Sequence, residues 1–214
     1  LLALASVIAI AAVTLALVAG VNRTALVAFI GSLLGVVLTS VLALVLLPGF
    51  KLHGAVQPYS ETLLYTGFEF LNLNRLFVAA IFIGASGAVV DVAIDVATAM
   101  QEVADKRPDL SHRELALSGF TVGRNMTSTM ITTLLMAYVS GYMSLLMVFM
   151  AQGTPPSLLL NTNYVAAEIL KTVVGSFGLV AVAPFTALVG SVLLIRSKRR
   201  EDEATATIDE DAAR

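Results

Sequence analysis

The sequence predicts an all-α, polytopic transmembrane helix bundle of about five spanning helices plus a short amphipathic cytoplasmic elbow helix. The chain has 214 residues, of which 57% are hydrophobic and only 13% are charged. A soluble domain averages about 25% charged residues. Charged residues are absent from the runs 1–22, 24–50, 76–90 and 125–167. Several of these runs exceed the roughly 20 residues that a helix needs to cross about 30 Å of hydrocarbon.

The first two spanning helices are expected from about Leu1 to Ala19 and from about Thr24 to Leu47. The turn Gly20-Val21-Asn22-Arg23 separates them, and Pro48-Gly49 ends the second. Gly31 and Gly35 in the second helix form a GxxxG spacing, which lets another helix approach closely.

Residues 50–75 are expected to form a loop that contains a short interfacial helix from Ser60 to Leu71, or alternatively an ordinary ordered loop. The third spanning helix follows from about Leu76 to Met100. A polar connection through Pro108 ends it.

The segment Ser111-His112-Arg113-Glu114 has the pattern of a capping box, in which Ser111 caps the amide of Glu114 and Glu114 reaches back. A short elbow helix should therefore begin at His112 and lead into the fourth spanning helix near Thr121. We expect that helix to continue to about Met150, with a weak point at Ser140-Gly141.

The stretch from Gln152 to Pro156 marks the next loop, and the fifth spanning helix runs from about Asn163 to Ile195. Pro184 is expected to kink it. Residues 1–195 then form the transmembrane domain, and residues 196–214 form a cytoplasmic tail, first basic and then acidic, that is predicted to be disordered. Residue 1 is not Met and no charged segment precedes the first apolar run, so we expect a fragment of a longer protein.

The distribution of Lys and Arg predicts the orientation in the membrane, because cytoplasmic loops carry an excess of these residues. The connection from Gln101 to Arg124 and the segment after Ile195 should both be cytoplasmic, since together they hold Lys106, Arg107, Arg113, Arg124, Arg196, Lys198, Arg199 and Arg200. The loop 151–162 has neither residue type and should lie outside. The loop 48–75, with Lys51 and Arg75, should lie outside too.

Asp91 and Asp95 are four residues apart within the third apolar segment, so both carboxylates lie on one face of a helix. A carboxylate in hydrocarbon costs about 2.5–3.5 kcal/mol on insertion scales, and such residues usually face a bundle interior or an aqueous path. The pair is therefore a candidate proton or cation relay. The alternative is that the helix surfaces early and Asp95 is merely solvated.

Arg124 and Asn125 begin the membrane part of the fourth helix at a depth comparable to that of Asp95. Arg124 could pair with Asp95, or it could extend to the lipid headgroups. From Asn125 to Thr133, six of nine side chains carry a hydroxyl or an amide: Asn125, Thr127, Ser128, Thr129, Thr132 and Thr133. They could line a hydrated track beside the aspartates, or their hydroxyls could bond to the carbonyls of their own helix.

Glu168 and Lys171 form a secondary charged pair near the outer end of the fifth helix. At a spacing of three residues they can pair on the helix surface for a few tenths of a kcal/mol. We expect this pair to be structural more often than functional.

No sequence motif predicts a cofactor, a metal site or a catalytic nucleophile. The chain has no cysteine and two histidines, and it lacks a phosphate-binding glycine loop, GxSxG, HExxH and a basic patch for nucleic acid. We therefore expect a protein that is not an enzyme and has no cofactor. Its expected partners are the lipid bilayer and either further copies of itself or an accessory membrane subunit.

Three segments resemble the YibE/F-like family of bacterial multi-pass membrane proteins: GASGAVVDVAIDVATAMQEV (84–103), SGFTVGRNMTSTMITTLLMAY (118–138) and EILKTVVGSFGLVAVAPFTAL (168–188). The resemblance implies an inner-membrane protein with further N-terminal sequence and brings no established activity. The family pattern favours an acidic residue after the Arg, where this chain has Asn125. Thr132-Thr133-Leu134-Leu135, with the Gly-rich Asp helix before it, is also similar to two helices of SecD/SecF-type proton-driven proteins.

These observations favour a proton- or cation-coupled transporter or permease component. Asp91 and Asp95 would bind the ion, Arg124 would modulate them, and the Thr-rich face would hydrate the route. The alternative is a membrane scaffold or accessory subunit without transport, whose polar residues pin helices together and bind a partner.

Overall fold

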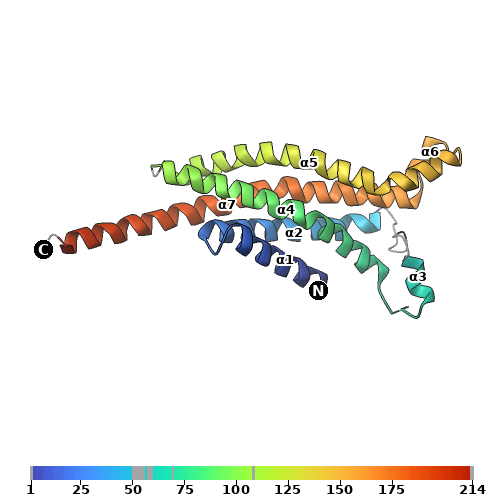
Figure 1. Cartoon of the computed structure of the whole chain (residues 1–214), viewed down its shortest axis with the longest axis horizontal. Helices are drawn as coiled ribbons and strands as arrows, with labels where there is room; N and C mark the ends of the chain where they lie inside the picture. Colours follow the sequence, from blue (N-terminus) through green and yellow to red (C-terminus); the bar gives the residue numbers. More distant parts are fainter. Residues whose placement is uncertain (1, 50–55, 57–59, 69, 108, 213–214) are drawn as a thin grey trace.

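The protein is a bundle of long helices, as a computed structural model of the chain shows (Figure 1). The structure describes residues 2–49, 56, 60–68, 70–107 and 109–212. Within them the elements are helices and turns, which confirms the all-α class. The helices are α1 (Leu2–Val18), α2 (Arg23–Gly49), α3 (Ser60–Tyr65), α4 (Leu73–Lys106), α5 (His112–Ala151), α6 (Pro156–Leu160) and α7 (Asn163–Ala212).

Among the described residues, four segments are long and apolar enough to cross a membrane: Arg23–Leu47, Leu73–Lys106, His112–Ala151 and Asn163–Ile195. The predicted first span corresponds to α1, whose 17 residues lie at the lower limit of about 17–25 residues for a spanning helix. The α4–α5 turn lies at the same end of the bundle as the C-terminal part of α7, whereas α3 and α6 lie at the opposite end (Figure 1).

Helix α7 is the centre of the bundle, because α2, α4 and α5 all pack against it. Its contacts with α2 follow a regular antiparallel register, in which Val27 meets Gly190, Gly31 meets Thr186, Gly35 meets Val182 and Thr39 meets Gly178. At each turn, a glycine of one helix thus contacts a branched side chain of the other helix. The predicted close approach at Gly31 and Gly35 is confirmed: a Cβ atom on Gly35 would lie only 3.1 Å from Cβ of Val182.

Helix α5 approaches α7 through a second pair of glycines, which the sequence reasoning did not single out. Gly119 and Gly123 are one turn apart and face Ala187 and Ala183 of α7. A Cβ atom on Gly123 would lie 2.6 Å from Cβ of Ala183 and 3.3 Å from Cγ2 of Val96 in α4. The small side chains therefore bring α4, α5 and α7 together at this level.

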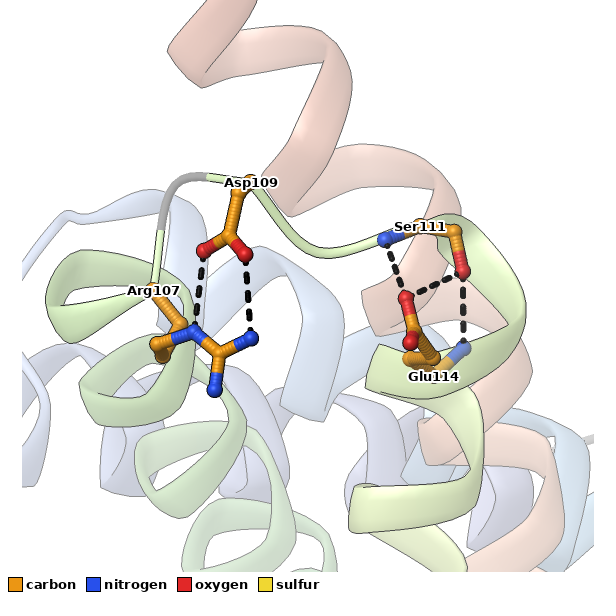
Figure 2. Close-up of polar contacts among 4 residues, drawn as sticks. All are labelled: Arg107, Asp109, Ser111 and Glu114. Atoms are coloured by element: carbon orange, nitrogen blue, oxygen red, sulfur yellow. Dashed lines mark hydrogen bonds and ion pairs between the residues drawn. The ribbon is translucent and has the colours of Figure 1, made fainter.

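The predicted capping box at the start of α5 is present. The hydroxyl of Ser111 accepts a hydrogen bond from the amide of Glu114 at 3.3 Å, and the amide of Ser111 donates to the Glu114 carboxylate at 2.9 Å (Figure 2). Just before it, Arg107 donates two hydrogen bonds of 2.9 Å to Asp109. These bonds lower the pKa of Asp109 below its ordinary value. The chain is thereby held in a tight turn between α4 and α5.

The separate elbow helix is not found, because α5 is one continuous helix from His112 to Ala151. No proline interrupts this segment, and Gly119 and Gly123 are held by the contacts that they make with α7. Ser140-Gly141 does not end the helix either. His112 also fixes the start of α5, since its Nδ1 lies 2.7 Å from the carbonyl oxygen of Ser191 in α7. A carbonyl only accepts, so Nδ1 carries the proton.

Several helix ends differ from the predicted ones. The interfacial helix α3 ends at Tyr65 rather than Leu71, because Gly67 adopts a positive φ of 91° and the amide of Phe68 bonds back to the carbonyl of Leu63. This is the pattern of a Schellman motif. The sequence reasoning missed α6, which begins with Pro156 at its first position. Proline is favoured there because its missing N–H would have no helical partner.

Helix α7 continues through Pro184 and ends at Ala212, where a disordered tail from residue 196 was predicted. The tail is rich in Ala, Glu, Lys and Arg, which are strong helix formers, and it extends a helix that is already nucleated within the bundle. Adding residues to an existing helix avoids the cost of nucleation.

Lys51, which the orientation argument places in the outer loop 48–75, lies outside the described residues.

Candidate functional site

Asp91 lies near the middle of α4, on the side that faces α1. Asp91 is one of the residues that line a small cleft of about 60 Å³ between the two helices. Val7, Ile10, Ala11 and Thr14 line the cleft from α1, and Ser86, Gly87 and Val90 line it from α4. About 10–15 Å³ is needed per water molecule, so this volume accommodates a few waters or one bare cation.

The Asp91 side chain is exposed, and no hydrogen bond or ion pair joins it to another described residue. Asp91 lies about 27 Å along the helix from Leu73 and about 22 Å from Lys106, at 1.5 Å per residue. A carboxylate at such a position is costly in lipid, so it requires water, a bound ion or another protein group.

The sequence reasoning missed Thr14 and Ser86, two hydroxyl-bearing residues that line the same cleft. The Ser86 hydroxyl donates to the carbonyl oxygen of Ile83 at 2.8 Å, so its oxygen remains free to accept a hydrogen bond. The available sequence signal was the Ser86-Gly87 pair one turn before Asp91. Thr14 belongs to a distant helix, and no local pattern connects it to Asp91.

Asp95 lies one turn further along α4 and is half-buried. The expected similarity in depth to Arg124 is present, because α4 and α5 are antiparallel with Met100 against Gly119 and Val96 against Gly123. However, no ion pair links Asp95 to Arg124 among the described side chains, and Arg124 is exposed. The two residues are level with each other but do not meet.

The polar run on α5 is not brought together with Asp91, whose cleft is lined by α1 and α4. Asn125, Thr132 and Thr133 are exposed. The hydroxyls of Thr132 and Thr133 donate to the carbonyl oxygens of Ser128 and Thr129, each at 3.3 Å. Thr132 and Thr133 therefore bond to carbonyl oxygens of their own helix, which is the alternative to a hydrated track.

Thr127 differs from the other threonines of this run. Its side chain is 6% exposed, and its hydroxyl has no hydrogen-bond partner among the described groups. A buried hydroxyl of this kind costs free energy unless a water molecule reaches it. Thr127 is therefore the one member of the predicted track whose hydroxyl the structure buries without a bond.

Glu168 and Lys171 form a partly buried pair rather than the surface pair that their spacing predicts. Nζ of Lys171 lies 3.5 Å from Oε1 of Glu168, and the two side chains are only 18% and 12% exposed. Two tyrosines of α5 complete the cluster. Nζ of Lys171 lies 5.4 Å from the centre of the Tyr138 ring, and Tyr142 lies with Glu168 in the wall of the adjoining groove.

The cluster adjoins an open groove of about 360 Å³ between α5 and α7, here called the chamber. Its wall is almost wholly apolar and is formed by Leu135, Tyr138, Val139, Tyr142, Leu145, Leu146, Val165, Glu168, Ile169, Thr172 and Val173. The sequence reasoning missed Tyr138 and Tyr142. Their spacing of four residues places them on one face of α5, which could have marked them as a pair.

The described side chains contain no group of three or more His, Cys, Asp or Glu residues that could hold a metal ion. What the described residues do contain is an apolar helix bundle with two carboxylates that have no ion-pair partner, Asp91 and Asp95, in the middle part of α4, and one partly buried ion pair, Glu168–Lys171. These features, with several helices of membrane-spanning length and hydropathy, define a multi-pass membrane protein.

A comparison with known protein families identifies the family to which this membrane protein belongs. The sequence model described as YibE/F-like protein matches residues 1–196, so the chain belongs to the YibE/F-like family. No curated protein and no solved structure matches the chain significantly. The family resemblance of the three sequence segments is thus confirmed.

Proposed function

We propose that this YibE/F-like protein conducts or couples to a proton or a cation, and that Asp91 is the group that binds it. The observation that carries the proposal is an exposed, unpaired carboxylate in the middle of α4, lining a cleft with the hydroxyl residues Thr14 and Ser86. Protons and hard cations bind to oxygen atoms such as those of carboxylates and hydroxyls.

Asp95 supports this role from one turn away. Two carboxylates on one face repel each other when both are ionised, which favours uptake of a proton or cation by one of them. Arg124 is level with this pair and supplies positive potential without neutralising it through a contact. The role is transport rather than catalysis, and the protein belongs in the bacterial inner membrane with the α4–α5 turn in the cytoplasm.

The test is ion flux in liposomes reconstituted with the full protein under a pH or cation gradient. Asp91→Asn keeps the size of the side chain and removes its charge, so we expect flux to fall to the level of empty liposomes. Glu102→Gln is the matched control, because Glu102 is an exposed carboxylate on the same helix that pairs with Lys106. Full flux in Asp91→Asn would exclude Asp91 from the route.

A second candidate function is a membrane scaffold in which Asp91 binds a polar group of a partner helix. The exposure of Asp91 beside the short edge helix α1 favours it, since α1 packs mainly against α2 and α4. Wild-type protein would then show no flux. Asp91→Asn would instead change the oligomeric state or the co-purification of a membrane subunit.

A further inference from the structure

The partly buried cluster of Glu168, Lys171 and Tyr138 on α5 and α7 has the chemistry of a site for an organic ammonium ion. Lys171 already places an ammonium group there, with its Nζ 3.5 Å from the Glu168 carboxylate and 5.4 Å from the centre of the Tyr138 ring. An aromatic face within about 6 Å of a cation, next to a carboxylate, is the arrangement by which proteins recognise ammonium groups.

The internal ammonium does not satisfy the site fully. A charge-assisted hydrogen bond between nitrogen and a carboxylate is usually about 2.7–2.9 Å long. At 3.5 Å, Oε1 of Glu168 receives no hydrogen bond although it is shielded from solvent. The hydroxyl of Tyr138 is also buried without a partner. A ligand that donates a shorter hydrogen bond would therefore compete with Lys171 for this carboxylate.

Lys171 has room to move away. Both Lys171 and the Tyr138 hydroxyl lie beside Gly84 of α4, where an added Cβ would be 3.7 Å from Cε of Lys171 and 3.8 Å from the Tyr138 oxygen. Glycine at position 84 thus leaves a gap of about one methyl group at the α4–α7 contact. A lysine side chain is long and flexible, so a small shift toward this gap would free the carboxylate.

The volume and the apolar wall of the neighbouring chamber indicate the class of ligand that would bind there. A volume of about 360 Å³ is within the roughly 300–1,000 Å³ that small-molecule pockets occupy, and its wall is apolar apart from Glu168, Thr172 and the two tyrosines. A ligand that fits both parts has an apolar chain for the chamber and a cationic head for Glu168 and Tyr138.

We propose that the α5–α7 chamber binds a hydrophobic ammonium cation, with its head group exchanging with Lys171 at Glu168 and Tyr138. This site is separate from the Asp91 cleft and does not depend on ion flux. Lys171 is then a tethered competitor, and its removal should strengthen binding. A purely structural Glu168–Lys171 pair predicts no such gain.

The experiment uses the full chain in lipid nanodiscs and octylammonium as the probe, with 1-octanol as the uncharged control of the same chain length. The readout is the midpoint of thermal unfolding by circular dichroism at increasing probe concentration, because a ligand that binds the folded state raises this midpoint. We expect octylammonium to stabilise the wild type more than octanol does.

Substitutions at the two ends of the ion pair should act in opposite directions. Lys171→Met should increase the apparent affinity for octylammonium by roughly tenfold, while Glu168→Gln should remove the difference between octylammonium and octanol. Weaker binding in Lys171→Met than in the wild type would overturn the proposal. Equal stabilisation by both probes in the wild type and in Lys171→Met would also overturn it.

Tyr138 provides a comparison that keeps Lys171 in place, in case Lys171→Met does not fold. Tyr138→Phe retains the ring and should retain binding, whereas Tyr138→Leu should weaken it several-fold. Equal binding by these two variants would contradict the ammonium site. Asp91→Asn should bind octylammonium as the wild type does, so failure of the flux proposal and failure of this one are distinguishable.

Discussion

At the scale of single residues, the informative side chains are those whose polar atoms are not compensated. Asp91 is exposed in mid-span without a described partner, and Thr127 buries a hydroxyl that makes no bond. In contrast, Thr39 and Thr186 donate to carbonyl oxygens of their own helix at 2.8 and 2.9 Å and serve packing alone. The same residue type thus has different consequences according to what surrounds it.

The capping box allows a prediction at this scale. Ser111→Ala removes the oxygen that accepts from the amide of Glu114, so we expect a loss of about 1 kcal/mol in stability. Ser111→Thr keeps the oxygen and is the matched control. The measurement is thermal unfolding in detergent followed by circular dichroism. Identical midpoints for the Ala and Thr variants would show that the cap contributes nothing.

At the scale of helices, the bundle depends on an exchange of small and branched residues between α2 and α7. Gly31 and Gly178 each receive a threonine from the opposite helix, and Gly35 receives Val182 between them. Dispersion and close approach of backbones are what hold helices together in lipid, where burial of apolar surface contributes little between them. A glycine in this seam is therefore a packing requirement.

This seam predicts that Gly178→Ala destabilises the protein by about 1–3 kcal/mol, because the added Cβ would overlap the Thr39 side chain. Thr39→Ala should restore part of the loss when it is combined with Gly178→Ala. Gly141→Ala is the control, since nothing lies within 4 Å of its added Cβ and alanine favours a helix. Chemical denaturation of the wild type, the three single variants and the double variant in mixed micelles measures the effect, and an additive double variant would contradict the predicted contact.

At the scale of the whole molecule, the elements found at each end of the bundle are consistent with one orientation in the membrane. The α4–α5 turn lies at the same end as the C-terminal part of α7, and α6 lies at the other end (Figure 1). The Lys and Arg residues of the sequence are concentrated at the first end, which the positive-inside rule assigns to the cytoplasm.

This assignment can be tested directly because the chain has no cysteine. Asp109→Cys and Ser157→Cys place one thiol at each end of the bundle. In intact cells, a maleimide that does not cross membranes should label Ser157→Cys and leave Asp109→Cys unlabelled until the cells are opened. The reverse pattern of labelling would invert the proposed topology.

The sequence alone determined the class of protein, the approximate helices and the local signals within them. Composition predicted a membrane bundle, the capping box predicted where α5 begins, and the spacing of Asp91 and Asp95 predicted a shared face on α4. These features depend on neighbours within one or two turns, which the helical period relates to one another. Where continuation of a helix was energetically easy, as near Thr121 or after Ile195, the predicted helix boundaries were wrong.

Only the tertiary structure decided which faces meet. It turned Asp91 toward α1 and away from the polar run of α5, and it placed the partly buried Glu168 and Lys171 beside Tyr138. These partners are far apart in the chain, so their contact depends on how whole helices rotate and approach. That rotation follows from small residues at several crossings acting together, which no single local pattern encodes.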